Sequence, residues 1–258
     1  MGDLKAFPSE KTVVVTGAAS ERGIGRGVAR RLATVGWSVG IIDLNEAQIE
    51  QVAAAISAET GGTVLGRAAD VSDESEVDGA IRSFEDELPA IVAVVNLAGV
   101  SDPTPFLEAT REQWERVMRI NATGTFVVTK RVAPKMVERH LGRIVNFSST
   151  AAQTGGGNYS KSVYAASKGA IESLTRSIAR ELAPFGVTAN VIAPASIDTD
   201  IMGGRITAER LPQFVRALPV GRLGTVREVA ALVEFLIGEE AGFITGATLN
   251  LNGGLRIG

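Results

Sequence analysis

Residues 12–25 read TVVVT-GAASERGIG and place a glycine-rich turn directly between an apolar strand and a helix. Gly17 permits the sharp exit from the strand, Gly23 leaves room for backbone amides to approach a phosphate, and Gly25 lets the helix pack closely on the sheet. The helix that begins near Ile24 points the positive end of its dipole at the turn. In this context the turn predicts a dinucleotide-binding site, whereas glycines alone would indicate an ordinary tight turn.

Apolar, β-branched runs alternate with helical patterns along the rest of the chain. Continuous runs such as IVAVV at residues 91–95 are typical of strands buried on both faces of a parallel sheet. The repeated strand–helix units predict one α/β domain over residues 1–258, a doubly wound Rossmann fold with a mostly parallel seven-stranded sheet. The predicted strands cover residues 12–16, 38–42, 63–69, 91–95, 143–147, 187–192 and 247–251. The predicted helices cover residues 24–35, 46–57, 77–84, 111–128, a continuation to 139 with Pro134 as a candidate kink, and 163–182.

One long irregular stretch, residues 198–220, is interrupted by two glycines and two prolines. Loops of this length inside a compact domain are usually functional or mobile. We therefore expect this stretch to form a lid over a substrate site rather than a loop without a role.

The composition excludes several kinds of protein. The 258-residue chain has a formal net charge of −3, which provides no basic field for nucleic acid or an anionic membrane. It has no cysteine and a single histidine, His140, too few ligands for a zinc site and no obvious partner for a Ser-His-Asp triad. The N-terminal residues lack a signal-peptide core, and no stretch approaches about 18 uninterrupted apolar residues. We expect a cytoplasmic protein with a small-molecule partner and no metal.

Residues 164–168 read YAASK. Four residues make about one helical turn, so Tyr164 and Lys168 project from the same helix face and can meet one ligand. This spacing alone often marks a surface pair. It gains weight here because the motif opens a predicted helix directly after the fifth predicted strand.

Together these motifs resemble the short-chain dehydrogenase/reductase family over essentially the whole chain. That family's usual turn is TGxxxGxG, and residues 16–25 depart from it by two extra residues around Glu21 and Arg22. Residues 96–99 (NLAG) resemble the family's NNAG, and residues 194–199 (PASIDT) resemble PGxIxT. The resemblance implies an NAD(P)-dependent oxidoreductase on a Rossmann fold.

The resemblance also implies a catalytic tetrad and a cofactor site. Ser148 competes with Ser149 for the tetrad, but the second serine of the pair matches the family's catalytic one. The implied tetrad is Asn121, Ser149, Tyr164 and Lys168. The implied cofactor-binding residues are Gly17, Arg22, Gly23, Ile24, Gly25, Asp43, Asp70, Val71, Asn96, Ala98, Gly99, Tyr164, Lys168, Pro194, Ile197 and Thr199.

Several of these residues carry a specific expected role. Asp70 and Val71 would flank the adenine ring, while the segment at Asn96 would mostly brace the central strand. The Ile197 backbone and the Thr199 side chain would hold the nicotinamide carboxamide. Thr199 could equally cap a helix of the lid, and the two roles are compatible.

The chemistry explains why these residue types are needed. Hydride transfer at a carbinol carbon requires a proton to leave or join the oxygen. A free tyrosine with a pKa of about 10 is a poor base at neutral pH. An ammonium roughly 4 Å away is worth about 4 kcal/mol at an effective dielectric of about 20, so we expect Lys168 to lower the pKa of Tyr164 by as much as about three units. Ser149 would stabilise charge on the reacting oxygen, Lys168 would also hold the nicotinamide ribose, and Asn121 would position a water behind it.

Asp43 stands where the family recognises the adenosine ribose, at the end of the second predicted strand. Its carboxylate would accept both ribose hydroxyls and repel a 2′-phosphate. Arg22 is contrary evidence, because relatives that use NADP often place a basic residue before the second glycine of the turn. Arg22 could instead pair with Asp43 or point to solvent. We therefore expect NAD to be preferred, with NADP as the alternative.

The leading hypothesis is an oxidoreductase of secondary alcohols and ketones. The alternative is a 3-oxoacyl-thioester reductase acting on an acyl-carrier-protein or coenzyme A substrate, which Phe185 weakens because carrier-protein reductases often have a basic residue before Gly186. A non-catalytic nucleotide-sensing protein is disfavoured by the complete tetrad. A partly apolar substrate is expected from the candidate pocket residues Val100, Phe106, Thr154, Tyr159, Ile201 and Met202. The resemblance further implies a homotetramer formed through residues 111–128, 163–182 and 247–258.

Overall fold

The computed structural model describes residues 6–157, 160–200, 207 and 209–257. Its seven strands form one sheet in the order β3-β2-β1-β4-β5-β6-β7, and every neighbouring pair is parallel. The predicted doubly wound α/β fold is confirmed, with a sheet that is parallel throughout. The strands are β1 (Thr12–Thr16), β2 (Ser38–Asp43), β3 (Val64–Ala68), β4 (Ile91–Asn96), β5 (Gly142–Phe147), β6 (Val187–Pro194) and β7 (Thr248–Leu251).

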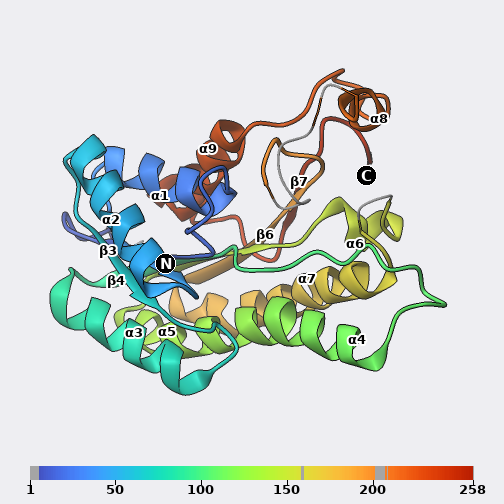
Figure 1. The fold of residues 1–258 in the computed structure, drawn as a ribbon. Coiled ribbons are helices and arrows are strands. Elements are labelled where there is room, and N and C mark those ends of the chain that lie inside the picture. The colour runs from blue at the N-terminus through green and yellow to red at the C-terminus, as the bar shows by residue number, and fades with distance from the viewer. Residues whose placement is uncertain (1–5, 158–159, 201–206, 208, 258) are drawn as a thin grey trace.

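Helices cover both faces of this sheet, with α1, α2 and α9 on one face and α3, α5 and α7 on the other (Figure 1). Alternate side chains of β1 enter the two cores, because Val13 and Val15 pack in one cluster and Val14 in the other. The helices are α1 (Ile24–Thr34), α2 (Glu46–Thr60), α3 (Glu74–Glu87), α4 (Arg111–Met118), α5 (Gly124–Arg139), α6 (Thr150–Thr154), α7 (Ser162–Leu182), α8 (Leu211–Val215) and α9 (Val226–Ile237).

Several helices differ from the prediction. The single helix expected over residues 111–128 is α4, then a π-helical turn, η1 (Arg119–Thr123), and then α5. Pro134 lies inside α5 without ending it, and α8 lies in the stretch expected to be irregular. The patterns also miss α9, although Thr225 and Glu228 form a capping box that marks its start. Strand ends differ from the prediction by one or two residues, as is usual.

The strand order reverses between β1 and β4, where the two halves of the fold diverge. In open α/β sheets this switch point leaves a crevice at the carboxyl ends of the strands, where nucleotides bind. The glycine turn lies at this point. The Thr16 hydroxyl accepts the N–H groups of Leu97 and Ala98 at 3.0 and 3.1 Å, which ties the end of β1 to the end of β4.

Two glycines of the turn permit close backbone contact. Gly17 has a φ of +74°, and a Cβ there would lie 2.7 Å from the amide nitrogen of Ala98. A Cβ on Gly25 would lie 2.3 Å from the Gly17 carbonyl oxygen. The expected reason for Gly25, close packing of the helix on the strand exit, therefore agrees with the geometry.

No helix of the described ranges combines the length and apolar character that crossing a membrane requires. The described residues also contain no group of three or more histidine, aspartate or glutamate side chains placed to hold a metal ion.

Substitution by alanine should have opposite effects on stability at Gly25 and at Gly79, because their surroundings differ. We expect Gly25→Ala to lower the free energy of unfolding by about 1–3 kcal/mol, because the methyl meets backbone that cannot move aside. Gly79→Ala in α3 is the matched control, since nothing lies within 4 Å of its added Cβ. It should stabilise the helix by about 0.5–1 kcal/mol. Urea unfolding of both variants checks this, and a Gly25→Ala protein as stable as the wild type contradicts it.

Candidate active site

A cavity of about 460 Å³ lies at the carboxyl ends of β4, β5 and β6. Three residues of the predicted tetrad line it, namely Ser149, Tyr164 and Lys168. Predicted cofactor residues Ile24, Pro194, Ile197 and Thr199 line the same space. Apolar side chains that close it include Leu97, Phe147, Phe214, Leu218 and Leu255. The structure thus brings the YxxxK motif and the PASIDT segment to one cavity beside the glycine turn.

Helix α7 carries Tyr164 and Lys168 in its first two turns, facing the end of β5. Both side chains are buried. Lys168 Nζ donates a 2.9 Å hydrogen bond to the carbonyl oxygen of Phe147, the last residue of β5, and lies 5.8 Å from the centroid of the Tyr164 ring. The predicted convergence of the two side chains is therefore present, and a backbone carbonyl fixes the lysine.

Burial dominates the electrostatics of this pair. It lowers the pKa of Lys168 to about 8 and raises the pKa of Tyr164, which a hydrogen bond with Ser149 only partly opposes. The expectation that Lys168 lowers the pKa of Tyr164 by up to about three units is wrong for the chain without cofactor. The physical reason is that both side chains lose hydration on burial, which disfavours the charged form of each.

The two serines after β5 have different surroundings. Ser149 caps the short helix α6, where its Oγ accepts the Ala151 N–H at 3.2 Å, and it also bonds Tyr164. Ser148 is buried, and its single hydroxyl hydrogen has two acceptors within reach, Glu172 Oε1 at 2.9 Å and the Lys168 carbonyl at 3.1 Å. The geometry therefore favours Ser149 over Ser148 as the serine that acts with the tyrosine.

Asn121 lies in the π-helical turn η1 and is completely buried. Its Oδ1 accepts the Val100 N–H at 2.8 Å, and its Nδ2 donates to the Val100 carbonyl at 3.0 Å and to Ser167 Oγ at 2.9 Å. A Cβ on Gly99 would lie 2.9 Å from Asn121 Oδ1 and 3.6 Å from Lys168 Nζ. The π turn thus aims Asn121 at the loop after β4, close behind the lysine.

The glycine turn has free donors for a phosphate. Helix α1 begins at Gly23 without a side-chain cap and has no acidic residue in its first turn, so its first N–H groups are available to an anion. Asp43, at the end of β2, accepts the Ala19 N–H and the Leu44 N–H, both at 2.8 Å. This carboxylate is therefore fixed beside the turn. These donors and acceptors fit a nicotinamide dinucleotide.

Asp70 and Val71 follow β3 and contact the π turn. Asp70 accepts from Arg119 Nη1 at 2.9 Å, and a Cβ on Gly124 would lie 2.6 Å from Val71 Cγ2. Burial works to raise the pKa of Asp70, yet hydrogen bonds from Ser72 and Arg119 outweigh it and hold the pKa below its usual range. Asp70 is thus held in its ionised form, and the dipeptide packs against η1 and the start of α5.

The side chain of Asn96, a predicted cofactor residue, is buried between neighbouring elements of the sheet core. Its Nδ2 donates to Asn146 Oδ1 at 2.8 Å and to Thr129 Oγ1 at 2.9 Å, inside the sheet core. This side chain braces β4 against β5 and α5, as expected for the motif, and is not among the residues that line the cavity.

Thr199 lies in a bend, where its hydroxyl donates to the Ile197 carbonyl at 3.5 Å. Residues 201–206, which the expected lid helix would include, lie outside the described residues. Of the candidate pocket residues, Thr154 lines the cavity, whereas Val100 does not and Phe106 is 76% exposed. Tyr159, Ile201 and Met202 lie outside the described residues. Phe214 and Leu255 are lining residues that no sequence signal marks, because each meets the cavity only through tertiary folding.

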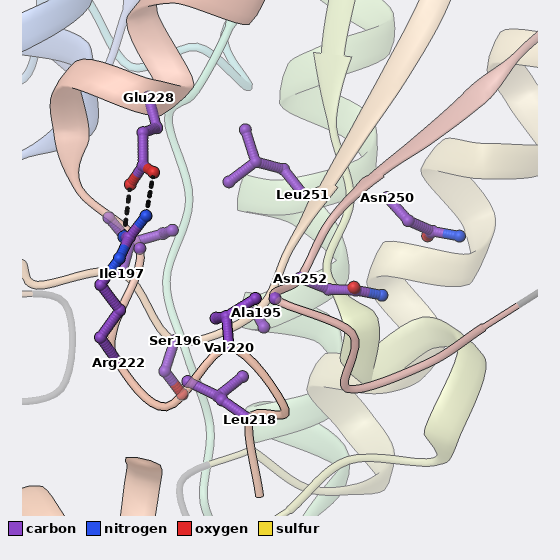
Figure 2. Close-up of a pocket in the computed structure, with 12 residues that line it drawn as sticks. Ala195, Ser196, Ile197, Leu218, Val220, Arg222, Glu228, Asn250, Leu251 and Asn252 are labelled. Atoms are coloured by element: carbon purple, nitrogen blue, oxygen red, sulfur yellow. Dashed lines mark hydrogen bonds and ion pairs between the residues drawn. The ribbon is translucent and has the colours of Figure 1, made fainter.

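A second cavity, of about 220 Å³, lies behind the segment after β6 (Figure 2). Its charged residues, Arg222 and Glu228, face each other at 2.6 and 3.0 Å. The hydrogen bonds from Arg222 lower the pKa of Glu228 to about 2, and Glu228 also caps α9 with Thr225. This pair therefore serves the start of α9, and the tyrosine and lysine are absent from the lining of this cavity.

Comparison with known proteins agrees with this geometry. The family described as Enoyl-(Acyl carrier protein) reductase matches residues 17–256. An uncharacterized short-chain type dehydrogenase/reductase, y4mP of Sinorhizobium fredii, is 33% identical over 247 residues, which cover 96% of this chain and 98% of that protein. This chain belongs to the short-chain dehydrogenase/reductase family.

Named members of the family are similarly related. A 3-oxoacyl-[acyl-carrier-protein] reductase of Aquifex aeolicus is 36% identical and covered to 97%, over 95% of this chain. 2-(S)-hydroxypropyl-CoM dehydrogenase 3 of Xanthobacter autotrophicus is 35% identical and covered to 96%, over 95% of this chain. The crystal structure of a 3-oxoacyl-[acyl-carrier protein] reductase from Brucella melitensis matches with a TM-score of 0.89 at 33% identity, over 100% of this chain and 99% of that one.

The short-chain dehydrogenase/reductase assignment settles the reaction class. The chain is an oxidoreductase that acts on CH–OH or keto groups, and its family uses nicotinamide cofactors. Which residues perform the reaction follows from the geometry above and is proposed below.

Lys168 should make stability depend on pH. Its pKa falls from 10.5 to about 8 on folding, so between these values the unfolded chain binds more protons and the free energy of unfolding rises with pH. Lys168→Met removes this titration. We predict that the unfolding free energy of the cofactor-free wild type, minus that of Lys168→Met, rises by up to about 3 kcal/mol from about pH 7 to about pH 10. Urea unfolding across this range tests it, and a flat difference contradicts the lowered pKa.

Proposed function

We propose that this oxidoreductase interconverts a secondary alcohol and a ketone, with Tyr164 as the acid–base and NAD as the preferred cofactor. The observation that carries the proposal is the meeting of Ser149, Tyr164 and Lys168 in one buried cavity beside the glycine turn. The end of β5 and the first turns of α7 supply these groups, and the glycine turn, more than 120 positions earlier in the chain, lies beside them. Their convergence supports a reaction centre rather than a surface pair.

The bound nicotinamide would supply or accept the hydride. Ser149 donates a hydrogen bond to the substrate oxygen and stabilises the charge that develops there. Tyr164 exchanges the hydroxyl proton with the same oxygen. Lys168 keeps its ammonium beside the tyrosine through the Phe147 carbonyl, from where it would hold the nicotinamide ribose.

Asn121 acts as a positioning residue in this proposal. Both hydrogens of its amide are donated and its oxygen accepts the Val100 N–H. The side chain therefore fixes the loop at Val100 and the start of α7 at Ser167 around Lys168. The predicted relay through a water at Asn121 stays a prediction.

The cavity suits a partly apolar substrate. Leu97, Phe147, Phe214, Leu218 and Leu255 supply apolar walls around the reacting groups. A 3-oxoacyl thioester is the second candidate, supported by the names of relatives from Aquifex aeolicus and Brucella melitensis. A panel of simple ketones and 3-oxoacyl thioesters, followed by the absorbance of reduced nicotinamide, separates the two. The lid at residues 198–220 stays part of the proposal.

Removal of the tyrosine hydroxyl should abolish turnover but not binding. We expect Tyr164→Phe to lose roughly 10²–10⁴ in kcat while its dissociation constant for NADH stays near that of the wild type. Ser149→Ala should lose activity in the same direction, since it removes a hydrogen bond to the reacting oxygen. Steady-state kinetics and NADH fluorescence measure both quantities.

Ser148→Ala is the matched control for Ser149→Ala. Its hydroxyl bonds Glu172 and the Lys168 carbonyl, so it should lower stability more than kcat. Substantial turnover by Tyr164→Phe, or a larger kcat loss in Ser148→Ala than in Ser149→Ala, contradicts the assignment.

The geometry near Asp43 supports a preference for NAD. A 2′-phosphate would approach a carboxylate that two backbone amides already fix. Arg22, the charge that could favour that phosphate, is paired with Asp198. We expect a higher kcat/KM with NAD than with NADP, and a smaller ratio in Asp43→Ser. Asp86→Ser, on the exposed face of α3, should leave the ratio unchanged. Equal or better use of NADP by the wild type contradicts the assignment.

A homotetramer is the proposed assembly. Trp114 on α4 and Phe126 on α5 are 45% and 41% exposed, and Phe243 and Ile257 are almost fully exposed. Trp114 and Phe126 lie within residues 111–128, expected to form one contact together with residues 163–182. Ile257 lies within residues 247–258, expected to form the other, and Phe243 precedes that range by four positions. Light scattering at micromolar concentration should give four times the chain mass. A monomeric mass contradicts the proposal.

A further inference from the structure

One ion pair joins the glycine turn to the segment after β6. Arg22 Nη2 lies 2.5 Å from Asp198 Oδ1, and Arg22 Nε lies 3.9 Å from Asp200 Oδ1. The sequence left three partners open for Arg22: a 2′-phosphate, Asp43 or solvent. The structure shows a fourth, two carboxylates that lie 176 and 178 positions further along the chain. Arg22 also belongs to the part of the turn that exceeds the usual length by two residues.

The pair crosses the crevice at the switch point of the sheet. Arg22 follows β1 and Asp198 follows β6, and β4 and β5 lie between these strands. Three strand spacings of about 4.8 Å put the two strand ends roughly 14 Å apart. The ion pair therefore bridges the gap between the ends of β1 and β6. This gap is where a dinucleotide binds in such folds.

Alternation along the segment after β6 explains why both carboxylates face outward. Ile197 and Thr199 are buried, at 5% and 4% exposure, and both line the cavity. Asp198 and Asp200 are the alternate residues, with side chains 47% and 33% exposed. Residues 198–200 form a bend and not a strand, and burial still alternates within it from one residue to the next. One side of the segment thus faces the cavity while the other meets Arg22.

The segment is held from its other side as well. The Asp198 N–H donates to the Gly224 carbonyl at 3.1 Å, and the Gly224 N–H donates to the Ser196 carbonyl at 3.0 Å. Gly224 precedes α9, whose first residue, Val226, packs against α1. The two hydrogen bonds to Gly224 therefore hold the segment to the residues directly before α9. Only the Arg22 pairs connect the segment to the glycine turn among the ion pairs of the described residues.

We propose that Arg22 is a positioning residue that clasps the Ile197–Thr199 segment over the cofactor crevice, so that the cofactor leaves only when its pairs with Asp198 and Asp200 open. The inference rests on the proposed cofactor site. Because two carboxylates neutralise the guanidinium, Arg22 acts on the segment and not as a phosphate ligand. The pairs are partly exposed, so the clasp is weak enough to open in each catalytic cycle and is screened by salt.

Cofactor release tests the clasp without catalysis. NADH is bound to the full-length protein and displaced by excess NAD in a stopped-flow fluorescence experiment. We expect Arg22→Gln and the double variant Asp198→Asn/Asp200→Asn each to release NADH about two- to fivefold faster, the size typical of an exposed ion pair. All three substitutions together should release it no faster than either variant, because they break the same contact. High salt should accelerate release from the wild type and not from the variants.

Arg30→Gln is the matched control, since it removes an exposed ion pair between Arg30 of α1 and Glu59 of α2. It should release NADH at the wild-type rate. Fast release by Arg22→Gln together with unchanged release by Asp198→Asn/Asp200→Asn overturns the clasp, because Arg22 then acts on the cofactor directly. Release of NADH at the wild-type rate from every variant also overturns the clasp, but it leaves the proposed cofactor site supported. Absence of NADH binding to the wild type overturns the cofactor site itself, and the clasp with it.

Discussion

All seven strands run in the same direction, and this one constraint assembles the site. Parallel strands end at a common edge, which therefore carries the turn after β1, Asp43 at the end of β2, Ser149 after β5 and Thr199 after β6. Lys168 joins them from a helix, and its bond to the Phe147 carbonyl ties that helix to the same edge. A different strand order would scatter the groups even if every motif were intact.

Without cofactor, the buried site disfavours the charged forms of both Tyr164 and Lys168. Burial lowers the pKa of Lys168 to about 8 and raises the pKa of Tyr164, so both groups resist ionisation in the free chain. Shifts of this kind cluster at reaction centres, where they cost stability. The tyrosine becomes a useful base at neutral pH only when its surroundings change. A positively charged nicotinamide ring and a ribose held by the lysine would provide such a change.

The sequence predicts the fold well because its signals are local. Apolar strands such as residues 91–95 and the glycine turn each report their own structure, and the seven strands follow within one or two residues at their ends. The π-helical turn at Asn121 has no local signal, since its extra residue shows only in the hydrogen bonds. The start of α9 carries a capping box that could have been used.

The site is predicted less completely than the fold. The helical spacing of Tyr164 and Lys168 brings them to one cavity as expected, but spacing says nothing about hydration, and the predicted direction of the tyrosine pKa is therefore wrong. The partner of Arg22 depends on a contact across the crevice that no local pattern encodes.

The central claim is that Tyr164 is an acid–base whose pKa the cofactor controls. The chain has only two tyrosines, Tyr159 and Tyr164, so Tyr159→Phe leaves a single reporter, and tyrosine labelled with a heavy carbon isotope at Cζ lets NMR follow its titration. The account predicts a pKa above the ordinary value of about 10 in the free protein and a decrease of at least about one unit with oxidised cofactor bound. The same pKa with and without saturating cofactor would contradict it.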